Sequence, residues 1–134
     1  MKDEKKWLAI RELNHSIIKR PVQVRIGFPA PARRDWRCPY QIVGLGSRRV
    51  RYAYGVDSMQ ALQMALEAVA IELRPHRSQL SWLNTLGLTG LYRPVPIGFG
   101  PKFAEQLEER IQKATETVAR RLESRATRAP VARE

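Results

Sequence analysis

The stretch from Arg48 to Leu73 constrains the fold most, because it changes from a strand pattern to a helix pattern at one point. Apolar and polar side chains alternate over 48–56, with the two-residue period of a half-buried strand. Asp57-Ser58-Met59-Gln60 then matches a capping box, in which Asp57 accepts from a helical N–H and Gln60 reaches back. The helix predicted from there ends before Pro75 and has small alanines beside an apolar face, which consists of Met59, Leu62, Leu66, Val69 and Leu73.

Two or three more strands are predicted upstream of this segment. Residues 22–26 alternate in the same way, and Pro29-Ala30-Pro31 is expected to end that strand because proline cannot continue a ladder. Residues 38–46 predict another strand, closed by the short turn Gly44-Leu45-Gly46-Ser47 that favours a hairpin to the following strand. The segment 7–13 fits either an edge strand or a helix, and we favour a strand.

The C-terminal third has a different character. Residues 78–101 are rich in apolar residues, glycine and proline, with Arg93 as the single charge, which predicts an apolar loop packed against another surface. Gly100-Pro101 predicts a second helix over 101–125, with proline in its first turn. Its apolar residues form a narrow stripe, and the residues from 126 to 134 are expected to be a frayed tail. The stripe consists of Phe103, Leu107, Ile111, Ala114, Val118 and Leu122.

This order of elements predicts an α+β fold. We expect an antiparallel sheet of three to four strands, a β-meander, with one helix packed on one face. An apolar loop and the long C-terminal helix follow. Residues 1–100 would form the α+β domain, and 101–125 either a helix of that domain or an interaction helix.

Positive charge is concentrated in the first half of the chain. The formal net charge is +11, and residues 1–56 carry 13 basic and 4 acidic side chains. If Tyr52 and Tyr54 face the packed helix together with Val22, Val24 and Ile26, the opposite sheet face becomes basic. The residues expected on that basic face are Arg11, Gln23, Arg25, Gln41, Arg49 and Arg51.

Two runs of residues resemble a known family. They are Trp36-Arg37-Cys38-Pro39-Tyr40-Gln41-Ile42-Val43-Gly44-Leu45-Gly46 and Tyr54-Gly55-Val56-Asp57-Ser58-Met59-Gln60-Ala61-Leu62. They are similar to the Trp-x-Cys-Pro-Tyr, Gly-Leu-Gly and Gly-Val-Asp-Ser-x-Gln-Ala-Leu elements of a small bacterial family of unknown function. The resemblance extends from about Trp7 to about Leu73, and it implies no activity, cofactor or catalytic residue. The helix from Pro101 lies beyond it.

No residue pattern predicts a catalytic, cofactor or metal site. Cys38 could act as a nucleophile beside His15 or His76. Its register with Tyr40 and Ile42 instead predicts a buried, inert thiol, and a single cysteine suits a reducing compartment. The histidines lack partners at ligand spacing. Trp36, among arginines, fits equally a base-stacking residue and a plug at the end of the sheet.

These features favour a non-enzymatic binding protein. The leading hypothesis is a protein that recognises a macromolecular partner, as an adaptor or an immunity-type inhibitor, or that forms a homo-oligomer through the C-terminal helix. The alternative is a nucleic-acid-binding module that uses the basic sheet face, although Tyr52 and Tyr54 would then point away from the arginines. A hydrolase or transferase using Cys38 and His76 has no positive signal. With no apolar stretch near ~20 residues and no signal peptide, the expected location is the cytoplasm, away from membranes.

Overall fold

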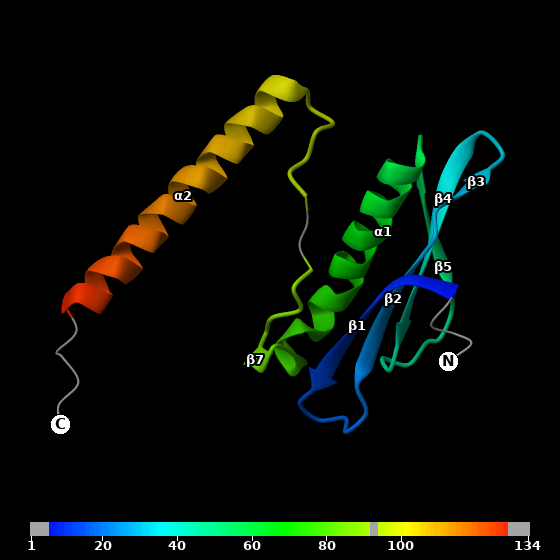
Figure 1. Ribbon diagram of the computed structural model, residues 1–134, viewed down its shortest axis with the longest axis horizontal. Helices are drawn as coiled ribbons and strands as arrows, with labels where there is room; N and C mark the ends of the chain where they lie inside the picture. The colour runs from blue at the N-terminus through cyan, green and yellow to red at the C-terminus, as the bar shows by residue number, and fades with distance from the viewer. Residues whose placement is uncertain (1–5, 92–93, 129–134) are drawn as a thin grey trace. The chain divides into compact units, whose positions relative to one another are not determined.

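The computed structural model describes residues 6–91 and 94–128. The chain divides into two compact units, residues 1–93 and 94–134. The first unit is an antiparallel sheet with one α-helix packed against it, so its α+β class agrees with the sequence prediction (Figure 1).

The sheet has seven strands, not the predicted three or four. Along the sheet, the order is β3-β4-β2-β1-β6-β7, with β5 paired to β4, and every pairing is antiparallel. The ambiguous segment 7–13 lies in a strand. The bounds are β1 Trp7–His15, β2 Val22–Gly27, β3 Ala30–Ala32, β4 Asp35–Val43, β5 Arg51–Gly55, β6 Leu80–Trp82 and β7 Thr85–Leu86.

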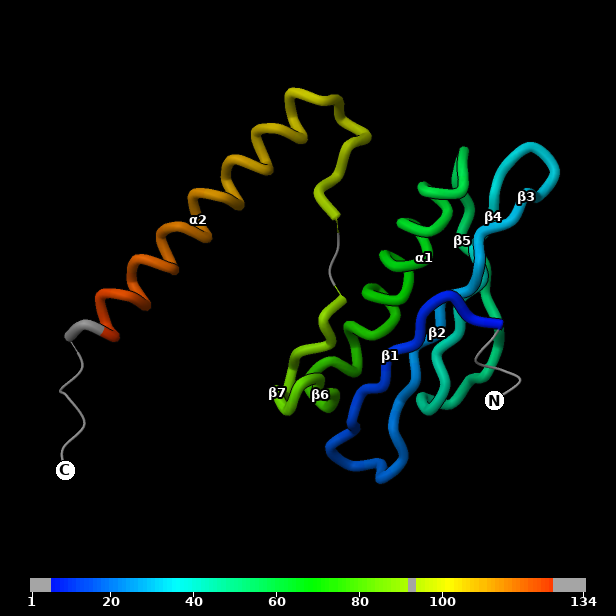
Figure 2. The backbone as a smooth tube through the Cα atoms, in the orientation of Figure 1, coloured from blue at the N-terminus to red at the C-terminus, as the bar shows by residue number. Residues whose placement is uncertain are grey.

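The additional strands are short and lie where loops were predicted. Ala30–Ala32 forms a hairpin with the start of β4, although two prolines were expected to end pairing there. Proline is tolerated because β3 pairs with β4 alone, so a missing N–H costs no second ladder. In the segment predicted as an apolar loop, β6 and β7 form a hairpin whose turn residues Leu83 and Asn84 both have positive φ, 51° and 61°. Figure 2 shows this hairpin beside the end of β1, where His15 pairs with Leu80.

Helix α1, Ser58–Leu73, begins at the predicted cap and leads into the 3-10 helix η2, Arg74–Gln79. The Gln60 N–H donates to Asp57 Oδ1 at 2.7 Å, and the Val56 N–H donates to Gln60 Oε1 at 2.6 Å. Gly55 is buried just before this turn, and a Cβ there would overlap the backbone nitrogen of Ala61. The junction therefore needs a capping side chain at Asp57 and a residue with no side chain at position 55.

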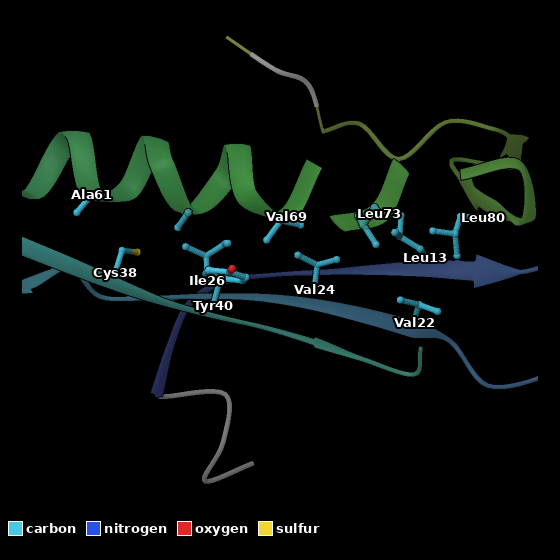
Figure 3. Close-up of a cluster of buried hydrophobic side chains, with 11 residues drawn as sticks. Leu13, Val22, Val24, Ile26, Cys38, Tyr40, Ala61, Val69, Leu73 and Leu80 are labelled. Carbon is cyan, nitrogen blue, oxygen red and sulfur yellow. The ribbon is translucent and has the colours of Figure 1, made fainter. Parts of the chain in front are cut away.

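The buried face of α1 differs from the predicted one. Met59 is 69% exposed and Leu66 39% exposed, because the small alanines rather than the longer side chains lie closest to the sheet. The buried residues recur every four positions: Ala61, Ala65, Val69 and Leu73. Figure 3 shows Ala61, Val69 and Leu73 of α1 facing the buried side chains of the sheet. The strand part of this core is Leu13, Val22, Val24, Ile26, Cys38, Tyr40 and Leu80.

The second unit contains helix α2, Pro101–Arg128. It starts where predicted but continues beyond Arg125, so residues 126–128 are helical rather than frayed, and 129–134 lie outside the described residues. Phe99 and Phe103 pack edge to face at its beginning, with ring centroids 5.6 Å apart. Among the helices described, none is both long and apolar enough to cross a membrane.

Candidate functional site

Strand register decides which side chains share a sheet face, because directly opposed residues in antiparallel strands point the same way. Cys38 pairs with Ala53 and is buried beneath α1, so Ala53 also faces the helix. Tyr52 and Tyr54, one position away on either side, therefore point away from α1. The prediction that both tyrosines pack against the helix is wrong, because the close approach of α1 admits only small residues there.

The same register corrects the predicted basic face. Arg11 pairs with Val24 and Arg51 with Tyr40, so both arginines lie on the helix side of the sheet. Arg11 stacks on Trp82, 3.9 Å from the ring centroid, and donates to the Thr89 carbonyl at 3.2 Å. Arg49 precedes β5 and lines a pocket with Arg51. Of the four predicted arginines, Arg25 is the one that faces away from α1.

We call the sheet surface opposite α1 the outer face, defined by Gln23, Arg25, Arg37, Gln41, Tyr52 and Tyr54. The Arg25 side chain is held in place on this face, because Nε donates to Gln23 Oε1 at 2.5 Å and Nη1 donates to Gln41 Oε1 at 3.1 Å. Gln41 is fixed in turn by donating to the Arg48 carbonyl at 2.5 Å. The guanidinium is thus oriented before any ligand arrives.

Arg37 and the two tyrosines form the aromatic part of the outer face. The Arg37 guanidinium carbon lies 4.3 Å from the centroid of the Tyr52 ring. Tyr52 is 41% and Tyr54 57% exposed. A pocket of about 480 Å³ adjoins them, lined by Pro31, Ala32, Arg33, Arg37 and Tyr54. Sequence reasoning missed this group, although the register of β4 against β5 puts Arg37 on the same face as both tyrosines. Arg33 joins them as a lining residue of the pocket.

Acids are present on the outer face as well. The pairing of Glu12 with Gln23, and of Asp35 with Ala32, places both carboxylates on this side. Gln23 Nε2 donates to Glu12 Oε1 at 3.4 Å. Asp35 lies at the start of β4, next to the hairpin turn at Arg33. The outer face therefore carries the cations Arg25 and Arg37 together with these two carboxylates, and Asp35 lies beside the turn that holds Arg33.

A second pocket, of about 230 Å³, lies on the helix side, lined by Tyr40, Ile42, Leu45, Ser47, Arg49, Arg51, Glu72 and His76. The Tyr40 hydroxyl donates to Glu72 Oε1 at 3.2 Å, and Arg51 Nη1 donates to the same oxygen at 2.5 Å. Burial, followed by the negative charge of Glu72, raises the pKa of Tyr40. The hydrogen bond from Arg51 to Glu72 raises the pKa of Arg51.

The predicted burial of Cys38 is confirmed. Its side chain is 0% exposed, its thiol donates to the Gly27 carbonyl at 3.4 Å, and burial raises its pKa to about 11. The Nδ1 atom of His15 accepts hydrogen bonds from the backbone N–H groups of Ile17 and Ile18, at 3.1 and 3.0 Å. Trp36 is half-buried against the core. Within the described ranges, no three His, Cys, Asp or Glu side chains are placed to hold a metal ion.

The apolar stripe of α2 is largely exposed. Ile111, Val118 and Leu122 are 54%, 53% and 59% exposed, and Phe103 is 41% exposed. Leu107 is half-buried, while Ala104 beside the stripe is buried. The stripe is thus a continuous apolar line on an otherwise charged helix.

Comparison with known proteins identifies a family but no individual relative. No curated protein and no solved structure matches the chain. A family model matches residues 9–93, a range that takes in α1, η2 and nearly the whole sheet and ends before α2. This chain therefore belongs to the family described as Domain of unknown function (DUF6968).

Proposed function

We propose that this protein is a non-enzymatic binding protein whose outer face holds single-stranded nucleic acid. The observation that carries the proposal is the grouping of Arg37 with Tyr52 and Tyr54 on one exposed surface. The sequence pattern alone placed Tyr52 and Tyr54 on the sheet face opposite the arginines, which counted against nucleic-acid binding. The strand register removes that objection. Both kinds of side chain now stand on the same side of the sheet.

The chemistry of these residues suits the two parts of a nucleotide. Exposed rings such as Tyr54 stack on any base, because every base has a π face. Guanidinium groups bind phosphate oxygens through paired N–H donors and also stack on rings. Because Arg37 already lies over Tyr52, it needs little reordering to present its free donors. Arg33 brings a second cation to the same pocket.

A single strand suits this surface better than a duplex. A duplex is read by an element that enters a groove, such as a helix or a two-stranded ribbon. The outer face presents flat strands and side-chain rings, which reach bases only when those bases are unpaired. The supporting contacts are to phosphates and ring faces, so we expect little sequence preference.

Fluorescence anisotropy with a labelled single-stranded oligonucleotide tests the proposal. Tyr54→Leu should weaken binding roughly tenfold or more, since stacking contributes ~1–3 kcal/mol per base, whereas Tyr54→Phe keeps the ring and should bind nearly normally. Arg37→Ala should weaken binding, but Arg74→Ala should not, because Arg74 is an exposed arginine at the end of α1. Equal losses from Arg37→Ala and Arg74→Ala would contradict a specific surface.

A second candidate function rests on α2. Its exposed stripe fits a helix-to-helix seam, which supports binding to a protein partner, as an adaptor or immunity-type inhibitor, or to a second copy. For either candidate we propose a cytoplasmic location, because a single buried thiol suits a reducing compartment.

A further inference from the structure

We propose that the pocket beside the C-terminal end of α1 binds a small oxyanion of the phosphate class. This pocket lies on the helix side of the sheet, so the inference does not depend on nucleic-acid binding at the outer face. Its walls come from four places: β4, the loop after β4, the start of β5, and the end of α1 with η2. It gathers Arg49, Arg51 and His76 around one cavity.

The arginines differ in how they are held. Arg51 donates through Nη1 to Glu72, which fixes its position, and the rest of its five N–H donors remain for a ligand. In the described part of the chain, no acceptor is bonded to the Arg49 guanidinium, while its backbone N–H donates to Ser47 Oγ at 3.2 Å. One oriented and one unpaired guanidinium, two residues apart, therefore line the same pocket, and guanidinium groups bind oxyanions through charge-assisted hydrogen bonds.

Glu72 does not cancel this attraction. Its carboxylate accepts hydrogen bonds from both Arg51 and the Tyr40 hydroxyl, and the positive charge of Arg51 balances its negative charge. Arg49 therefore supplies uncompensated positive charge to the cavity. The half-buried His76 ring closes another wall and offers a ring nitrogen.

The size of the cavity limits the ligand. Its volume of about 230 Å³ is below the ~300–1,000 Å³ of pockets that hold drug-sized ligands. A water molecule occupies ~30 Å³ in the liquid, so there is room for one hydrated tetrahedral anion. A phosphate ion, or the phosphate end of a larger molecule that projects outward, fits this limit.

Titration with inorganic phosphate at constant ionic strength, followed by backbone amide shifts in NMR spectra, tests the site. We expect saturable shifts confined to residues 45–51 and 72–76. Arg49→Ala should weaken binding at least fivefold, whereas Arg48→Ala, which removes the neighbouring exposed arginine that does not line the pocket, should leave it unchanged.

The outcomes separate clearly. Shifts that never saturate, or equal affinity in wild type and Arg49→Ala, would overturn the proposal. Adenosine 5′-monophosphate and adenosine identify the source of the phosphate: equal binding of the monophosphate and inorganic phosphate supports a free ion, and tighter binding of the monophosphate supports a phosphomonoester. Binding by adenosine alone would contradict an oxyanion site.

Arg37→Ala on the outer face should leave phosphate binding unchanged, which keeps this test separate from the nucleic-acid test.

Discussion

Asp57 fixes the point at which strand becomes helix. Its carboxylate accepts the Gln60 N–H, one of the helical donors that has no partner within the helix. Asp57→Ala should lower the free energy of unfolding by about 1 kcal/mol, the usual cost of a lost N-cap. Urea denaturation measures this, with Ser58→Ala as a control that leaves the cap in place. An unchanged denaturation midpoint for Asp57→Ala would show that the cap contributes nothing.

Cys38 makes a pH-dependent contribution to stability. Its pKa is about 11 in the folded protein and 9.0 ordinarily, so the unfolded chain loses the thiol proton first. The stabilisation is therefore complete below about pH 9 and is lost as the pH rises through about 11. Between pH 8 and 11, wild type should lose more unfolding free energy than Cys38→Ala. Tyr40 titrates in the same direction in both proteins, so identical pH profiles would contradict the effect of Cys38.

At the scale of elements, the sequence predicts each long element but not the orientation of one strand. The alternation over 48–56 indicates that one face is buried, and by size and apolar area two tyrosines are better candidates for burial than Ala53 and Gly55. The structure reverses this choice, because α1 lies so close that a Cβ at Gly55 would meet the helix backbone. Only the packing distance between two elements decides the face, and a single strand pattern carries no information about that distance.

Short strands were missed for a related reason. β3, β6 and β7 have three, three and two residues, too few to show a two-residue period. Of the three, β6 also depends on a strand far along the chain, as in the pairing of Leu80 with His15. The candidate site could be predicted only in part for the same reason. Arg25 was predicted on the outer face, but the pocket near Arg33 exists because β3 folds back onto β4.

The stripe of α2 leads to a prediction about this helix. Leu107→Asp with Ile111→Asp should abolish self-association or partner capture while the first unit keeps its unfolding temperature. Light scattering and thermal denaturation measure the two effects. Gln106→Asp with Gln112→Asp adds the same charge away from the stripe and should change neither. Loss of the whole fold in the stripe variant would instead place α2 in the core.

At the scale of the whole molecule, the positive charges behind the net charge of +11 are distributed over more than one surface. Arg33 and Arg37 line the outer-face pocket, while Arg49 and Arg51 line the pocket on the helix side. The basic first half of the sequence is therefore divided between two faces of the sheet. Long-range attraction to an anionic polymer arises from the total charge, but the contacts that hold it depend on position.

The salt dependence of single-strand binding tests the central claim most directly. The logarithm of the association constant should fall linearly with the logarithm of the salt concentration, with a slope that shrinks by ~0.7 for each phosphate contact removed. Arg33→Ala with Arg37→Ala should reduce the slope by about 1.4. Arg74→Ala with Arg77→Ala removes the same charge from exposed positions at the end of α1 and in η2, and should change the slope little. Equal reductions in both double variants, or an unchanged slope in the first, would contradict binding at the outer face.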